Sequence, residues 1–261
     1  MGKVNRMEQA KVQNLALTAA RSRLLALDMV YGAASGHIGG SLSSLDILTT
    51  LYFHVMRVNP DAPQAPERDR FVLSKGHCTP ALYSTLAQRG FFPLEELKQF
   101  RRIDGHMSGH AEMRHVKGVD MSTGSLGQGI SAAVGMALAG KADGRDYRVY
   151  ALLGDGEIEE GQVWEAAMFA AHKKLDNLCL IVDSNGLQID GPVSEVAGPA
   201  PIDKKFEAFG FDVQIINGHC FDELEAAFAQ AKTVKGKPSV IIAKTTKGKG
   251  VSFMEDQVSW H

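Results

Sequence analysis

The sequence has no long apolar run, few cysteines and no large excess of charge of one sign. A bilayer span needs about 18 or more consecutive apolar residues, and no segment reaches that length. The first residues, 1–13, are too polar for a signal peptide. The formal net charge is −2, which gives the whole chain no electrostatic preference for nucleic acid or anionic membranes. We therefore expect neither as a partner.

The small number of cysteines also limits the kinds of site that the chain can form. The three cysteines, Cys78, Cys179 and Cys220, are odd in number and far apart, and no CxxC spacing occurs. This pattern argues against a disulfide framework and against a structural zinc site. It is typical of a protein in a reducing compartment, so we expect a cytoplasmic location.

Glycine, in contrast, is abundant and unevenly placed. The 27 glycines cluster in residues 32–40, 105–129, 154–161 and 186–198. Glycines that gather at segment ends indicate that the backbone is brought close to a ligand. The length suits one large domain with a sizeable core, and no linker interrupts the sequence. We expect residues 1–261 to form a single domain.

Apolar periodicity predicts helices that alternate with strands in the second half of the chain. Alternation of this kind predicts an α/β fold with a parallel sheet flanked by helices on both faces. Ligands bind such sheets at the carboxyl ends of the strands, where the strand order reverses. The expected strands are residues 70–74, 147–153, 178–183, 211–216 and 239–243, and the expected helices are residues 7–30, 44–56, 80–89, 128–140, 163–174, 204–209 and 223–232.

Two polar motifs directly follow neighbouring expected strands. Gly154–Asp155–Gly156 closes one strand and Asn185 closes the next. The glycines let the backbone approach a diphosphate, and N–H groups near the following helix favour an anion. Asp155 and Asn185 supply hard oxygens, and the main-chain carbonyl of Leu187 can complete a Mg²⁺ site shared with two phosphate groups. A GDG sequence alone is often just a tight turn, but its pairing with Asn185 is far more specific.

Read together, these motifs resemble those of transketolases, and the resemblance covers essentially the whole chain. It implies the thiamine diphosphate-binding fold and a cofactor of thiamine diphosphate with Mg²⁺, or with Ca²⁺ or Mn²⁺ in its place. Asp155, Asn185 and Leu187 would hold the metal. In two family motifs, Ile38 and Ala111 replace the usual prolines. The matching segments are SGHIGG at 35–40, SKGH at 74–77, GHAE at 109–112, TGSLGQG at 123–129, GH at 218–219 and KTTKGKG at 244–250.

The resemblance also implies roles for individual side chains. His37, His77, His110 and His261 match residues that surround the cofactor and the sugar, where imidazole can transfer protons at neutral pH. Glu160 matches a residue of an acidic network between subunits, although acids at a helix N-terminus also simply complement the helix dipole. The implied cofactor contacts are His77, Gly124, Ser125, Leu126, Gly154, Asp155, Gly156, Glu160, Asn185 and Lys244.

A further implication concerns what this sequence does not contain. In transketolases a glutamate from a second, pyrimidine-binding domain holds the aminopyrimidine ring of the cofactor. The sequence stops at His261 without such a domain. We therefore expect the pyrimidine-binding and C-terminal domains on a separate subunit, in an α₂β₂ complex, and expect activity only with that partner.

The leading interpretation is a transketolase subunit whose complex moves a two-carbon ketol unit from a ketose phosphate to an aldose or aldose phosphate. A related alternative is a split enzyme for a branched or sulfonated sugar, such as apulose 4-phosphate or sulfofructose. Another is a non-catalytic chain that only binds the cofactor. Nicotinamide binding is disfavoured because no GxGxxG follows the first expected strand.

Overall fold

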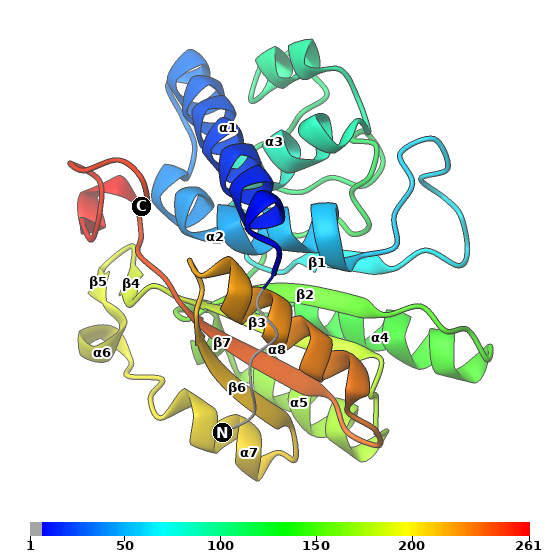
Figure 1. Ribbon diagram of the computed structural model, residues 1–261. Helices are drawn as coiled ribbons and strands as arrows, with labels where there is room; N and C mark the ends of the chain where they lie inside the picture. The colour runs from blue at the N-terminus through cyan, green and yellow to red at the C-terminus, as the bar shows by residue number, and fades with distance from the viewer. Residues whose placement is uncertain (1–6) are drawn as a thin grey trace.

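The computed structural model describes residues 7–261, and its centre is a five-stranded parallel sheet (Figure 1). The spatial order is β1-β2-β3-β7-β6. The chain crosses from β1 to β3, continues to the edge strand β6 and returns to β7, so the strand order reverses beside β3. The strands are β1 (Arg70–Leu73), β2 (Val149–Gly154), β3 (Leu178–Ser184), β6 (Asp212–Asn217) and β7 (Ser239–Lys244).

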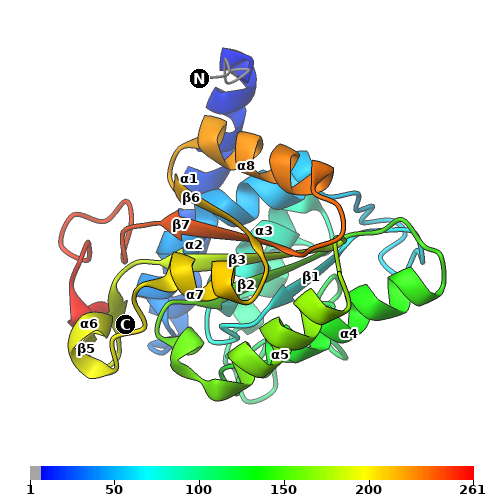
Figure 2. The ribbon, with the colours of Figure 1, turned by 90° about the horizontal axis from the view of Figure 1, so that it is seen from below.

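Helices cover both faces of the sheet (Figure 2). One face packs against α1 (Gln9–Ala33), α2 (Ile38–Thr50), α3 (Thr79–Arg89) and α8 (Phe221–Thr233), and the other against α4 (Gly129–Ala142), α5 (Gly161–His172) and α7 (Ile202–Ala208). Alternate residues of β2 enter different cores: Tyr150 lies in the first and Ala151 in the second. Burial on both sides explains why the central strands are unbroken apolar runs. The expected α/β class is confirmed.

The expected helices are all present, with local signals at their ends. α3 has Pro80 in its first turn and ends at Gly90, whose φ of 95° is readily adopted by glycine. α8 has Asp222 and Glu223 in its first turn and Lys232 in its last, which complements the helix dipole at both ends. These ends agree with the expected boundaries to within a few residues.

The start of α2 differs from the expectation. The sequence predicted a helix from residue 44, but α2 begins at Ile38 and includes Gly39 and Gly40. A Cβ atom on Gly39 would lie 2.3 Å from the carbonyl oxygen of Trp260. These glycines therefore serve close packing of a helix rather than the end of one, and every residue of α2 is buried.

Among residues 7–261, no helix combines the length and apolar character that a bilayer span requires.

Several short elements have no counterpart in the sequence predictions. The additional elements are the 3-10 helices Leu94–Gln99, Glu157–Glu159 and Val258–Trp260, the hairpin of β4 (Leu187–Gln188) and β5 (Gly191–Pro192), and α6 (Val193–Val196). The π-helix Leu51–Val55 directly continues α2 and lies within the helix expected at residues 44–56.

Candidate active site

The carboxyl ends of β1, β2 and β3 and the loop after β7 surround a cavity of about 290 Å³. Its position at the carboxyl edge of the sheet agrees with the sequence prediction. Eleven of the expected site residues line it: His37, His77, His110, Gly124, Leu126, Gly154, Asp155, Gly156, Asn185, Leu187 and His261.

The expected metal ligands lie on adjacent strand ends and are held in place by the backbone. Asp155 is 2% exposed, and its carboxylate accepts the N–H of Gly156 at 3.0 Å and that of Gly186 at 2.6 Å. Asn185 Oδ1 accepts the N–H of Leu187 at 3.1 Å. Within the described residues, no group of three or more His, Cys, Asp or Glu side chains could hold a metal by itself. The single carboxylate, amide and carbonyl fit Mg²⁺ only if phosphate oxygens complete the coordination.

Lys247 places a buried cation in the same cavity. Its side chain is among the fully buried ones, with 1% of the residue exposed. The ammonium donates to the carbonyl of Leu187 at 3.1 Å and contacts His261 Nδ1 at 2.7 Å. Burial, and then the nearby Lys75, lower the pKa of Lys247 to about 8. In the part of the chain that the structure describes, this ammonium has no carboxylate partner, so the cavity fits an anion such as a diphosphate.

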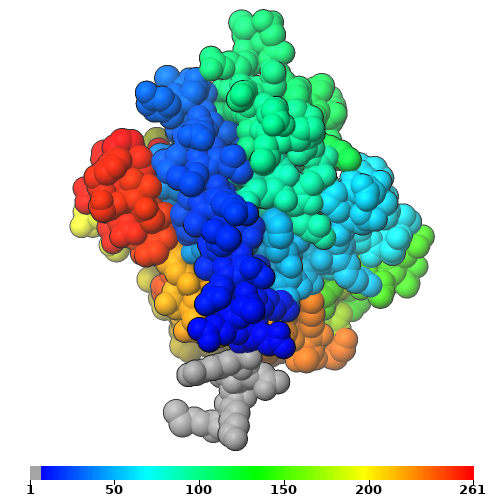
Figure 3. Space-filling model, turned by 45° about the horizontal axis from the view of Figure 1, so that its top comes forward, coloured from blue at the N-terminus to red at the C-terminus, as the bar shows by residue number. Residues whose placement is uncertain are grey.

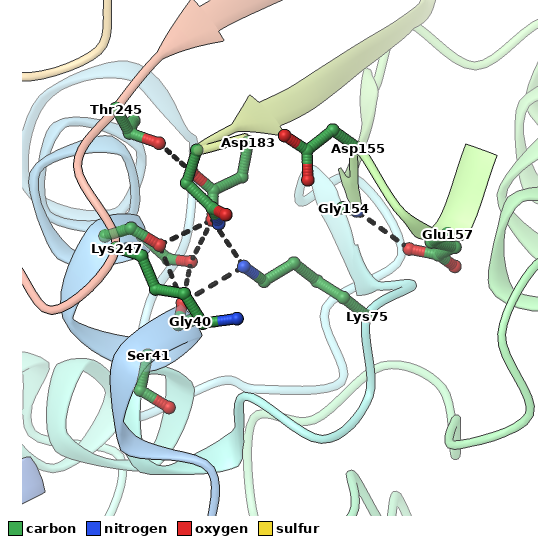
Figure 4. A network of polar contacts seen from close by, with 12 residues as sticks. Gly40, Ser41, Lys75, Gly154, Asp155, Glu157, Asp183, Thr245 and Lys247 are labelled. Carbon is green, nitrogen blue, oxygen red and sulfur yellow. Dashed lines mark hydrogen bonds and ion pairs between the residues drawn. The ribbon is translucent and has the colours of Figure 1, made fainter. Parts of the chain in front are cut away.

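A second lysine, Lys75, lines the cavity and is fully paired (Figure 4). Lys75 and Asp183, which are 2% and 0% exposed, form an ion pair. Lys75 also donates to the carbonyl of Gly40 at 3.0 Å, while Asp183 accepts the hydroxyls of Ser43, at 2.6 Å, and Thr245. Burial opposes ionisation of Asp183, but Lys75 and these donors outweigh it and lower the pKa. The network joins α2 to the ends of β1, β3 and β7.

Glu157 is buried under the loop after β2 and forms hydrogen bonds that hold it. It is 2% exposed, and its carboxylate accepts the N–H of Gly154 and of Gly127, both at 3.0 Å, and the hydroxyl of Ser74 at 2.5 Å. Burial nevertheless raises its pKa. The N–H groups of Gly154 and Gly156 are thus occupied by Glu157 and Asp155, and contact of these two glycines with the cofactor stays a prediction.

Four histidines from distant parts of the chain gather at the cavity. The ring centre of His37 lies 5.0 Å from that of His77, 5.3 Å from that of His261 and 6.3 Å from that of His110. Burial is the main cause that lowers the pKa of His37 and His77 to about 4 and that of His261 to about 3. At pH 7 these three rings are neutral, and each can accept one hydrogen bond and donate another.

The tautomer of one ring follows from its partner. An ammonium has only donors, so His261 Nδ1 accepts from Lys247 at 2.7 Å and the ring proton lies on Nε2. Among the described residues, His37 Nδ1 is buried and has no hydrogen-bond partner. Such an atom is costly unless something binds it, which fits a ligand with polar groups.

A family model described as "Transketolase, thiamine diphosphate binding domain" matches residues 14–261. This chain belongs to that family. The resemblance to transketolases and the thiamine diphosphate-binding fold are thereby confirmed.

The similarity extends to transketolase subunits and to longer transketolases. The 6-deoxy-6-sulfo-D-fructose transketolase subunit SqwG of Clostridium sp. (strain MSTE9) is 49% identical over 92% of this chain and 87% of its own length. A subunit of the apulose-4-phosphate transketolase of Phocaeicola vulgatus is 45% identical over 96% of this chain and 89% of its own length. Human transketolase is 44% identical over 100% of this chain but 41% of the human protein.

A solved structure gives the same relation. The crystal structure of transketolase from Campylobacter jejuni matches 95% of this chain with a TM-score of 0.89 at 41% identity. The match covers 40% of that chain, so the present chain spans less than half of the solved transketolase.

Three residues that the resemblance to transketolases assigned to the cofactor do not line the cavity. Ser125 and Glu160 are exposed, and Glu160 occupies the N-cap position of α5. Lys244 is exposed and donates to the hydroxyl of Ser184 at 3.0 Å. Lys244 is the last residue of β7 and turns away from the cavity, whereas the chain brings Lys247 back into it. Of Lys244 and Lys247, only Lys247 lines the cavity, and contact of Lys244 with the cofactor stays a prediction.

Other residues at the transketolase cavity were missed by sequence reasoning. Lys75, Glu157, Gln188 and Lys247 line it, and Asp183 supports it. The sequence could have indicated Lys75 and Asp183, because each is a charged residue at or beside the end of an apolar strand. Buried charges are rare unless they are paired. Glu157 directly follows the Gly154–Asp155–Gly156 motif, and nothing in the local sequence distinguishes it from an ordinary helix-terminal acid.

Acidification is expected to destabilise this transketolase chain between about pH 6.5 and pH 4. Burial and the charge of Lys75 lower the pKa of His77 from 6.5 to about 4, so in this window the unfolded chain binds a proton that the folded chain does not. The contribution of His77 to the free energy of unfolding is therefore fully present above pH 6.5 and is lost as the pH falls towards 4. Asp155 acts in the opposite direction, because burial raises its pKa to about 6.

Thermal unfolding at fixed pH steps tests this expectation. His77→Gln should flatten the decline between pH 6.5 and 4, and the matched change His115→Gln, at an exposed position, should leave it unchanged. An H77Q protein with the wild-type slope would show that His77 does not cause the decline.

Proposed function

We propose that this chain is the diphosphate- and metal-binding subunit of a two-subunit transketolase. The complex would move a two-carbon ketol unit from a ketose phosphate to an aldose or aldose phosphate acceptor. The observation that supports this most directly is one cavity that combines the Asp155, Asn185 and Leu187 oxygens, the uncompensated ammonium of Lys247 and a ring of neutral histidines.

In this proposal the chain's residues have separate tasks. Asp155, Asn185 and the carbonyl of Leu187 hold Mg²⁺, and Lys247 supplies the positive charge next to the diphosphate. Thiamine diphosphate, when bound, supplies the electron sink that carbon–carbon bond cleavage beside a carbonyl requires. The N–H on His261 Nε2 can donate to a sugar oxygen, and a neutral His37 or His77 can accept a proton from a sugar hydroxyl.

The names of the relatives and the open side of the site support a partner subunit. The two relatives that this chain covers almost completely are both named as subunits. At the cavity, Leu126 and Ile189 remain 37% and 63% exposed, which suits apolar surface that a cofactor and a second chain cover. We propose that the partner supplies the pyrimidine-binding domain, in an α₂β₂ assembly. The free thiols of all three cysteines suit a cytoplasmic location.

A second candidate concerns the substrate. The relatives named for a sulfonated sugar and for a branched-sugar phosphate match nearly their whole length, at 87% and 89%, whereas human transketolase matches over 41%. The relatives that match over nearly their whole length are thus subunits named for unusual sugars. A donor with a sulfonate or a branched carbon skeleton is therefore the alternative to an ordinary ketose phosphate.

Reconstitution with the candidate partner tests the proposal. We expect the mixed pair to transfer the ketol unit when assayed against a panel of ketose phosphates, apulose 4-phosphate and 6-deoxy-6-sulfofructose, and each chain alone to show none. Removing divalent metal with EDTA should abolish the transfer, and added Mg²⁺ should restore it. Full activity of this chain alone would refute the two-subunit proposal. A pair that binds thiamine diphosphate without any transfer would favour a non-catalytic role for this chain.

A further inference from the structure

Two side chains outside the cavity form hydrogen bonds to the loop that contains Lys247. The N–H of Thr246 donates to His219 Nε2 at 2.8 Å, and the carbonyl of Lys249 accepts from Arg23 Nε at 3.1 Å. These two contacts flank Lys247 on either side in the sequence. Figure 3 shows the C-terminal segment, in red, lying beside α1, in blue, which contains Arg23.

One carboxylate joins both contacts. Asp46, on α2, accepts from Arg23 through two bonds of 3.1 and 2.7 Å and from His219 Nδ1 at 2.7 Å. All three side chains are largely buried, at 15%, 8% and 14% exposed for Arg23, Asp46 and His219. A bidentate arginine–carboxylate pair has a fixed geometry, so Asp46 is itself firmly oriented.

The carboxylate also selects the tautomer of His219. Ionised Asp46 only accepts hydrogen bonds, so His219 Nδ1 must carry the proton. In the neutral ring this leaves Nε2 as an acceptor, which is what the N–H of Thr246 requires at 2.8 Å. The three side chains therefore form a directed chain of hydrogen bonds from α1 and α2 to the backbone beside Lys247.

We propose that Arg23, Asp46 and His219 form a clamp that positions the Thr246–Lys249 segment so that the Lys247 ammonium stands in the cavity. His219 does not line that cavity, so it is a positioning residue and not a catalytic one. The link to a diphosphate rests on the proposed function, while the effect on the position of Lys247 does not.

The geometry makes Lys247 sensitive to this clamp. Its ammonium reaches the carbonyl of Leu187 and the ring of His261, so its place in the cavity depends on where the backbone of this segment runs. Among the described residues this backbone is also held by the N–H of Gly248, which donates to the carbonyl of Gly39, and by the carbonyl of Lys247, which accepts from the N–H of Asp256, both at 3.0 Å. Release of Thr246 would let the segment move outward and expose the Lys247 side chain.

Two substitutions each preserve a different one of the two hydrogen bonds of His219. His219→Asn can still donate to Asp46 from its amide but cannot reach Thr246. His219→Gln places an amide oxygen near the position of Nε2 and can still accept from Thr246. The net free energy of one hydrogen bond corresponds to a factor of about ten in an equilibrium constant. We therefore expect H219N to speed hydrogen exchange of the Thr246 amide about tenfold. Acylation of the Lys247 amine by a small reagent should increase similarly, and H219Q should remain near wild type.

The exposed Lys204 provides an internal reference for acylation in each protein. Wild-type rates at Thr246 and Lys247 in H219N would overturn the inference, as would equal effects of H219N and H219Q. If H219N does not fold, H219Q and Asp46→Asn in the folded state decide instead: Asp46→Asn should loosen Thr246 and Lys247, and an unaltered segment would overturn the inference.

Calorimetry with thiamine diphosphate and Mg²⁺ then tests the purpose of the clamp. We expect affinity about tenfold lower in H219N and close to wild type in H219Q. Unchanged affinity in an H219N protein whose Lys247 has become reactive would overturn the link to the cofactor. A wild-type chain that binds no thiamine diphosphate, even with its partner, would instead refute the proposed function, and exchange and acylation would still decide the clamp.

Discussion

Replacement of Asp155 by asparagine is expected to lower the affinity for thiamine diphosphate, at saturating Mg²⁺, by at least roughly a hundredfold. Asp155 is the only carboxylate among the three proposed metal ligands, and loss even of groups that merely orient ligands costs about 10–100-fold. The asparagine side chain has the same shape and can still accept one of the two backbone N–H bonds, so the loop should persist while its charge is lost.

The measurement is a calorimetric titration with thiamine diphosphate in excess Mg²⁺. Asp190→Asn is the matched control, because Asp190 is exposed in the same strand-end region and does not line the cavity. The wild-type affinity should also decline below about pH 6, since burial raises the pKa of Asp155 to about 6 and a metal needs the ionised carboxylate. D155N binding as tightly as wild type would rule Asp155 out as the metal ligand.

Replacement of Lys75 by methionine is expected to destabilise the fold by about 3–5 kcal/mol, the usual cost of removing one partner of a buried ion pair. Asp183 is fully buried, and without Lys75 its charge would keep only hydroxyl and amide donors. Methionine preserves most of the side-chain volume, so the loss reports mainly the uncompensated charge.

Urea unfolding of the full chain measures this effect. Adding Asp183→Asn to Lys75→Met should recover a large part of the loss, because the remaining groups are neutral and still partly hydrogen-bonded. As a control, Lys204→Met breaks an exposed pair with Glu207 and should change stability by less than about 1 kcal/mol. A K75M protein within about 1 kcal/mol of wild type would show that the pair contributes little.

The sequence was sufficient for the features that depend on local pattern. The strands are apolar because both their faces are covered, and Asp155 and Asn185 directly follow two of them, so their meeting at one edge of the sheet could be predicted. The gathering of the histidines was implied by the family resemblance, and the structure places all four at the cavity. What roles they have in catalysis remains a prediction.

The rest could not be predicted because it depends on contacts between distant segments. Nothing local separates Lys244 from Lys247, and the choice is made by how the chain leaves β7 and by contacts to α1 and α2. Likewise Glu157 is buried because Ser74 and Gly127 come to it, while Glu160 stays in solvent. The need for glycine at position 39 of α2 comes from the carbonyl of Trp260, which is far from it in the sequence and leaves no room for a Cβ atom.

That contact between Gly39 and Trp260 has a consequence for the order in which the cavity can be completed during synthesis. The first turn of α2 leaves the ribosome early, but the wall that packs against it, with Lys247 and His261, is made much later. Contacts between residues so distant in sequence close slowly, because their loop entropy must be overcome first. The cofactor site is therefore among the last parts of this domain to be finished, whichever helices and strands form before it.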